Sequence, residues 1–172
     1  MMRIIRKLSS NFSSVEEVIL FFRIFLLITI LPLLTRFLSV PKLMKVITPR
    51  DLKTLKIKNL DQETRIEKLV KFTNYVLSFN LWIYKNTCLK RSLVLYHSLR
   101  RSGINVRICF GVRYKNCLPD TKKKLEGHAW LLYNGDIFLE SNTEITKTYK
   151  VTYCFPEVKE EVGEAIINHE SI

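Results

Sequence analysis

The sequence predicts an α+β fold, with helices in the first part of the chain and an antiparallel sheet in the second. Up to Gly103, apolar residues recur at helical spacing, and from residue 104 onward they form short runs bounded by turn residues. An Asn-Gly pair inside 128–141 favours a tight β-hairpin. We therefore expect a helix packed on a small antiparallel sheet, preceded by an N-terminal apolar helical segment.

The composition is that of a folded protein. The chain has 172 residues, of which 47% are hydrophobic and 26% charged, which suffices for one domain with a core and an appendage. The formal net charge of +12 would suit nucleic acid, an anionic membrane or an acidic peptide. The basic residues are scattered and no nucleic-acid-binding motif accompanies them, so we expect no nucleic-acid partner.

The cysteines indicate neither a metal site nor a disulfide framework. They lie at positions 88, 109, 117 and 154, without a CxxC pair or a Cys/His metal spacing. We therefore expect no metal and no cofactor. The basic N-terminus is not followed by a small-residue cleavage site, and the expected compartment is the reducing cytoplasm.

The most apolar stretch spans residues 16–38. Its run from Val18 to Leu34 is interrupted by Arg23 and Pro32, whereas a membrane span needs about 20 apolar residues with few or no charges. The favoured interpretation is a helix that packs against its own domain or a partner. Association with the membrane surface and a true span are the alternatives.

The next segments divide the chain into two parts. Residues 41–61 look like a polar linker, and 62–81 repeat apolar residues at helical spacing. The predicted division is an N-terminal apolar helix and linker over 1–61 and the main folded domain over 62–172. Trp82 is assigned to core packing.

After the helices the period changes to that of strands. Residues 104–114 predict a strand, 115–127 a polar loop, 128–141 a hairpin, and 150–155 a further strand. The acidic tail from Pro156 carries little information.

Residues 86–103 predict an amphipathic helix with a thiol in its first turn. Asn86 and Thr87 are helix-start residues, and Gly103 is a stop signal. One apolar face is formed by Leu89, Leu93, Tyr96 and Leu99. Unpaired N–H groups and the helix dipole at a helix N-terminus favour the thiolate, which is the nucleophilic form of cysteine, and can also stabilise an oxyanion. Cys88 is therefore a candidate nucleophile.

A cysteine nucleophile needs a general base, and the chain has three histidines. His97 lies too far along the predicted helix to reach Cys88, and His169 lies in the acidic tail. His128 opens a strand directly after Gly127. His128 is therefore the candidate base.

The third member of such a site is a carboxylate that orients the imidazole. A three-residue turn with Gly135 in the left-handed position would set His128 opposite Glu140, on the same face of the hairpin. A two-residue turn would instead pair His128 with Ser141. Asp136 lies at the turn, about 13 Å along the strand from the histidine. We therefore expect a three-residue turn and choose Glu140, with Asp136 as the alternative.

Two stretches of the chain resemble a known family. They are CLKRSLVLYHSLRRSGINVRICFGVR over 88–113 and GHAWLLYNGDIFLE over 127–140. Together they resemble the transglutaminase-like cysteine peptidase fold. More narrowly, they resemble the lasso-peptide leader peptidases, the B proteins whose C-terminal domain processes the microcin J25 precursor. That family shows a Cys-Leu-x-Arg helix start, a helix ending in Arg-Arg-x-Gly, a Gly-Val-Arg strand end and a His-Ala-Trp hairpin.

The resemblance implies a triad with Cys88 as nucleophile, His128 as base and Glu140 as orienting carboxylate. The broader family usually has Asp where Glu140 falls. The implied function is a cysteine peptidase that removes the leader from a ribosomally synthesised, lasso-type precursor peptide. The alternatives are a transglutaminase or amidase acting on side-chain amides, and a non-enzymatic membrane-associated interaction protein.

The resemblance also implies partners. A separate macrolactam cyclase, which resembles asparagine synthetase, would act after leader removal. Nothing ahead of Cys88 alternates like the small sheet with which leader-binding modules add a peptide strand. We therefore expect a separate leader-binding protein, docked partly on the apolar face of residues 16–38.

Overall fold

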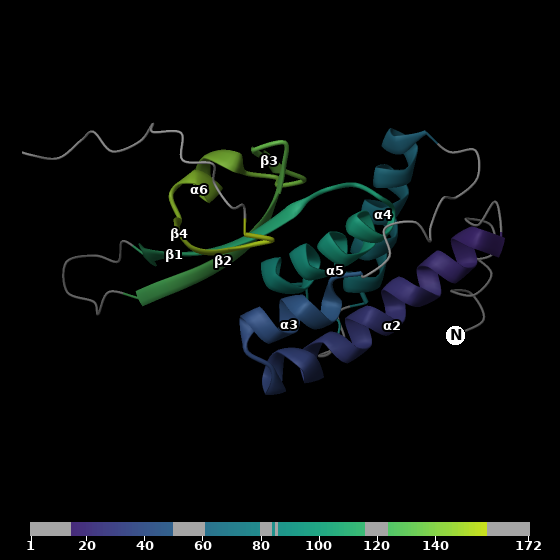
Figure 1. Ribbon diagram of the computed structural model, residues 1–172, viewed down its shortest axis with the longest axis horizontal. Helices are drawn as coiled ribbons and strands as arrows, with labels where there is room; N and C mark the ends of the chain where they lie inside the picture. The colour runs from purple at the N-terminus through teal and green to yellow at the C-terminus, as the bar shows by residue number, and fades with distance from the viewer. Residues whose placement is uncertain (1–14, 50–60, 80–83, 85, 116–123, 158–172) are drawn as a thin grey trace, which may run out of the picture.

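The computed structural model of the chain is shown in Figure 1. It describes residues 15–49, 61–79, 84, 86–115 and 124–157. Several features considered above lie outside the described residues: Trp82, Cys117, His169 and the tail beyond residue 157.

Four helices form one side of the molecule. They are α2 (Val15–Phe37), α3 (Val40–Ile47), α4 (Gln62–Leu77) and α5 (Cys88–Arg101). Helix α5 lies between the other helices and the sheet, and α2 and α3 lie on the far side of the helical layer (Figure 1). The predicted helices over 62–81 and 86–103 are confirmed, although α4 ends at Leu77.

Helix α3 corrects the prediction that residues 41–61 form a polar linker from their start. Ser39 is its N-cap residue and Pro41 lies in its first turn, where the missing N–H of proline costs no hydrogen bond. The buried face of α3 consists of Leu43, Met44 and Ile47. This apolar spacing was present in the sequence, but two lysines within an eight-residue element obscured it.

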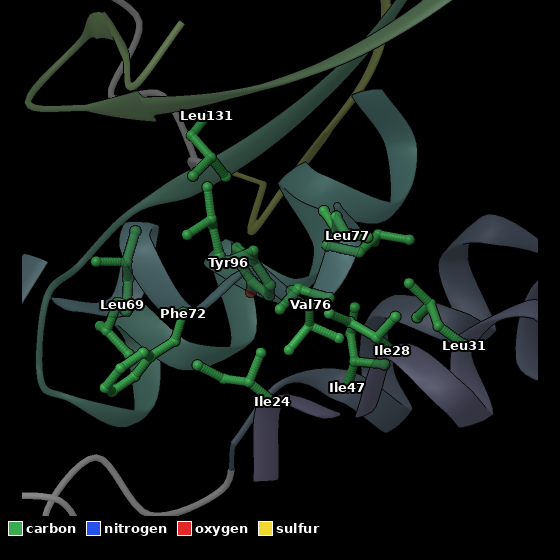
Figure 2. Close-up of a cluster of buried hydrophobic side chains, with 14 of the residues drawn as sticks. Ile24, Ile28, Leu31, Ile47, Leu69, Phe72, Val76, Leu77, Tyr96 and Leu131 are labelled. Atoms are coloured by element: carbon green, nitrogen blue, oxygen red, sulfur yellow. The ribbon is translucent and has the colours of Figure 1, made fainter. Parts of the chain in front are cut away.

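One hydrophobic core joins the helices to the sheet. It takes Ile24 and Ile28 from α2, Phe72 and Val76 from α4, and Leu131 from the sheet (Figure 2). All five side chains are at most 5% exposed. Because α2 and α3 contribute to the same cluster as α4 and α5, the N-terminal helices pack on the helix that begins with the cysteine.

The sheet has four antiparallel strands in the order β3-β2-β1-β4 (Figure 1). The strands are β1 (Arg107–Lys115), β2 (Lys124–Tyr133), β3 (Asp136–Phe138) and β4 (Lys150–Phe155), and a short helix, α6 (Thr143–Lys147), connects β3 to β4. The α+β class with an N-terminal apolar helix is thereby confirmed. Strand β2 starts inside the segment predicted as a loop, and α6 was not predicted.

The hairpin between β2 and β3 has a two-residue turn, so the three-residue turn we expected is wrong. Tyr133 pairs with Asp136, and Asn134 and Gly135 both have positive φ, at 52° and 93°. Positive φ at both central residues is the type I′ geometry, whose twist matches that of the flanking strands. The Asn-Gly pair adopts this geometry at little cost.

Cys109 of β1 and Cys154 of β4 form a disulfide, with their Cα atoms 4.1 Å apart. The two residues lie directly opposite each other in the strand register. The expectation of a chain without disulfides is therefore wrong. The cysteines therefore no longer indicate a reducing compartment. A cytoplasmic location stays a prediction.

Candidate active site

Cys88 is the first residue of α5. Thr87 caps this helix by accepting a hydrogen bond at 3.3 Å from the backbone N–H of Lys90. The thiol is free and exposed. In the first turn of any helix the leading N–H groups have no intrahelical acceptor, so those of Cys88 and Leu89 point toward the space in front of the helix.

The three residues chosen from the sequence line the same cavity. Cys88, His128 and Glu140 surround an open volume of about 530 Å³. Its other lining residues are Asn74, Asn86, Arg91 and Ser141. The cavity thus collects side chains from α4, from α5 with the residues that precede it, from β2 and from the segment after β3.

His128 lies within β2 and is held from several directions. Its Nε2 is 3.4 Å from Oε2 of Glu140, and the two side chains are only 17% and 13% exposed. Its ring stacks on Trp130 at 5.8 Å between centroids and contacts Tyr149 at 5.0 Å. Because the carboxylate lies at Nε2, Nδ1 is the ring nitrogen that Glu140 does not engage.

Glu140 reaches His128 for a different reason from the one we gave. In the observed register, a continued β3 would place Glu140 opposite Ala129 and on the other face from His128. Strand β3 instead ends at Phe138, and Leu139 takes a left-handed φ of 59°. This change of direction returns the glutamate to the histidine.

Arg91 holds the chain where it changes direction. Its Nη1 donates a hydrogen bond to the carbonyl oxygen of Leu139 at 2.8 Å and lies 3.8 Å from Oε1 of Glu140. Its Nε donates to Oδ1 of Asn74 at 3.4 Å. From the sequence alone, Arg91 is only a positive charge on the same predicted helix as Cys88. Its spacing of three residues from Cys88, which places both on one side of α5, was the available signal.

The other candidates lie elsewhere. Asp136 is exposed at the hairpin turn and does not line the cavity. His97 contacts the carbonyl oxygen of Ile47 with its Nδ1 at 2.6 Å, between α5 and α3. Burial lowers the pKa of His97, and the nearby charges of Arg101 and Arg23 lower it further.

Tyr149 is a contributor that the sequence did not single out. It precedes β4, contacts His128, and is covered on its ring by the guanidinium of Arg113 at 4.5 Å. Arg113 is itself paired with Glu126 across β1 and β2 at 3.1 Å. No local pattern marked Tyr149, because its position depends on α6 bringing β4 back beside β1.

Among the described residues, no group of three or more His, Cys, Asp or Glu side chains could hold a metal ion. The cavity is instead lined by a cysteine, a histidine and a carboxylate. A cysteine at a helix N-terminus, with a histidine from the neighbouring sheet and a carboxylate from the segment after β3, is an arrangement typical of cysteine-dependent acyl-transfer sites.

Comparison with known families agrees with this class. The family model for the transglutaminase-like superfamily matches residues 31–154, and the chain belongs to this superfamily. The match covers α5 and all four strands, and with them the cavity. No curated protein and no solved structure matches the chain significantly. The superfamily generally includes cysteine-dependent enzymes, so the domain suggests a cysteine peptidase or transglutaminase type of activity.

Proposed function

We propose that the protein is a cysteine peptidase that removes the leader from a ribosomally synthesised, lasso-type precursor peptide. The observation that supports catalysis is that Cys88, His128 and Glu140 line one open cavity. Within it, Nε2 of the histidine lies 3.4 Å from Oε2 of the glutamate. The observation that supports the substrate class is the motif resemblance over 88–113 and 127–140.

In this proposal the residues act in a fixed order. The Cys88 thiolate attacks the scissile carbonyl, and the oxyanion that forms is stabilised by the first-turn N–H groups of α5. Protonated His128 gives its proton to the leaving amine, which departs as the C–N bond breaks. A water molecule, deprotonated by His128, then hydrolyses the thioester. Glu140 orients the imidazole and stabilises its charged form.

The leader and the later steps involve other proteins in this proposal. The substrate is the precursor peptide, and its leader is recognised by a separate leader-binding protein. The new amine released by cleavage is the nucleophile that a macrolactam-forming cyclase, resembling asparagine synthetase, would use next. No metal or cofactor takes part in the proposed chemistry.

The proposal is tested by cleavage of the precursor by folded variants. We expect Cys88→Ala to abolish cleavage while the circular dichroism spectrum stays that of the wild type, and His128→Ala to be comparably inactive. Asp136→Asn is the matched control, because Asp136 is exposed and outside the cavity. Turnover at the wild-type rate by folded Cys88→Ala would end the cysteine-peptidase proposal.

Two measurements distinguish the other candidate functions. A transglutaminase would incorporate a fluorescent primary amine into a glutamine side chain, whereas a peptidase yields two peptides of the masses expected for backbone hydrolysis. A non-enzymatic protein with a structural cysteine would react slowly with iodoacetamide at neutral pH. We expect fast labelling at Cys88, because its thiol is exposed at a helix N-terminus.

A further inference from the structure

Helix α2 presents an uncovered apolar stripe. We define the α2 stripe as the six exposed side chains of Ile19, Phe22, Leu26, Ile30, Leu33 and Phe37. They recur at steps of three or four residues and so lie along one side of the helix, over a length of about 27 Å. Of the thirteen large apolar side chains exposed among the described residues, nine lie on α2 and α3, so the exposure is local to this face.

The charges beside the stripe have one sign. Arg23 and Arg36 are exposed on either side of the stripe on α2, and Lys42 and Lys45 are exposed on α3, which follows directly. Glu16, in the first turn of α2, is the one exposed acidic side chain described on these two helices. A surface of this composition is complementary to an apolar phase bordered by negative charge.

The opposite side of α2 is committed to the core. Ile24, Ile28 and Leu31 are at most 1% exposed, and buried Glu17 is paired with Lys68 of α4. Helix α2 is long and apolar enough to cross a membrane by length and composition, a test that a core helix also passes. To span a bilayer, α2 would have to leave its core contacts or take α4 and its charges into the hydrocarbon, which costs far more than lying at the surface.

We propose that the α2 stripe docks the protein on the surface of an anionic lipid bilayer. The axis of α2 then lies parallel to the membrane plane, with the stripe in the headgroup region and the flanking arginines and lysines against lipid phosphates. A lipid surface fits better than a protein partner because the stripe is a ridge along a helix, whereas a protein would have to supply a matching groove. This docking is independent of the chemistry at Cys88.

The experiment is co-sedimentation of the full chain with vesicles made of equal parts phosphatidylcholine and phosphatidylglycerol. We expect binding to these vesicles, and at least about tenfold weaker binding for the double variant Phe22→Ser/Leu26→Ser, because two large side chains no longer enter the interface. Both residues are about 60% exposed, at 63% and 58%, so the substitutions leave the core intact. The double variant Lys42→Gln/Lys45→Gln and vesicles of pure phosphatidylcholine should each also reduce binding.

The matched control removes exposed apolar area elsewhere. Tyr114 and Leu125 pair across β1 and β2 and are 66% and 56% exposed. We expect Tyr114→Ser/Leu125→Ser to bind the vesicles like the wild type, and Cys88→Ala to do so as well, whatever its peptidase activity.

Four results would overturn the proposal. The first is failure of the wild-type chain to bind anionic vesicles, and the second is an equal loss of binding in the stripe variant and the control. The third is resistance of the bound protein to carbonate washing, which would indicate a membrane span. The fourth is a dimer, or a complex with a leader-binding protein, that cannot bind vesicles and that Phe22→Ser/Leu26→Ser dissociates.

Discussion

Glu140 is placed between two cationic or protonatable groups, His128 at one carboxylate oxygen and Arg91 at the other. We predict that Glu140→Gln lowers the single-turnover cleavage rate by about 10²–10⁴-fold, because an amide cannot stabilise the charged imidazole. Asp136→Asn, at the exposed hairpin turn, should leave the rate nearly unchanged. The opposite ranking would show that the acid acting on His128 is not Glu140.

The residues of the site differ in how far sequence could predict them. Cys88 was predicted from local signals, since a helix start and its cap lie within a few residues. His128 followed from elimination among three histidines. Glu140 was chosen through a turn geometry that the structure contradicts, and the residue was nevertheless the one beside the histidine. The left-handed φ of Leu139 brings it there, and the carbonyl oxygen of Leu139 accepts a hydrogen bond from Arg91, a contact that no local pattern encodes.

At the scale of elements, Gly111 permits the close approach of three strands. A Cβ at Gly111 would lie 2.8 Å from the carbonyl oxygen of Lys150 and 2.8 Å from the ring of Trp130, which stacks on His128. We predict that Gly111→Ala destabilises the protein by about 1–3 kcal/mol, because the backbone oxygen has no room to move aside. Chemical denaturation measures this, and cleavage activity should fall with it.

Gly127→Ala is the control for Gly111→Ala. Gly127 lies opposite Val112 in the neighbouring pair of the same ladder, and a Cβ there meets nothing within 4 Å. We therefore expect unchanged stability. Equal destabilisation by both substitutions would mean that the contact with Lys150 and Trp130 is not the reason why position 111 requires glycine.

The contact between α3 and α5 makes stability depend on pH. Burial holds the pKa of His97 below its ordinary value, so the folded protein favours the neutral ring while the unfolded chain binds a proton below about pH 6.5. The unfolded state then binds more protons, and stability is lost as the pH falls below that value. We predict that the free energy of unfolding, measured by urea denaturation, falls less on acidification for His97→Gln than for the wild type. An identical pH dependence would contradict this, because His128 and His169 are common to both proteins.

The elements that sequence missed are short or depend on distant partners. Helix α3 has eight residues, so its apolar spacing spans only two turns, and α6 has five residues, too few for a periodic signal. The pairing of Cys109 with Cys154 requires the register of β1 against β4, which are 45 residues apart in the chain. The long helices α4 and α5 and the strands of the sheet were predicted because each carries its own apolar period.

At the scale of the whole molecule, leader recognition is the function that we expect a partner to supply. The secondary-structure elements described ahead of Cys88 are helices, and the four strands described all follow it. We predict that the purified chain cleaves its precursor slowly, and that a leader-binding protein raises kcat/KM mainly by lowering KM. Efficient, leader-dependent cleavage by the chain alone would sink this expectation. An increase confined to kcat would point to activation of the site instead of substrate recruitment.

The turn in the chain at Leu139 has a further consequence for how activity is lost. Glu140 follows a three-residue edge strand, and this segment is only partly buried against the core through Phe138 and Leu139 and is held by one guanidinium. Cys88 and His128 instead belong to elements that supply fully buried core residues. Segments with so few buried contacts open with a smaller free energy than the domain as a whole. The protein would therefore have a local melting step, in which mild denaturant separates Glu140 from His128 while α5 and β2 remain folded. Amide exchange at residues 136–140 would be faster than in β2 and would report inactivation before unfolding.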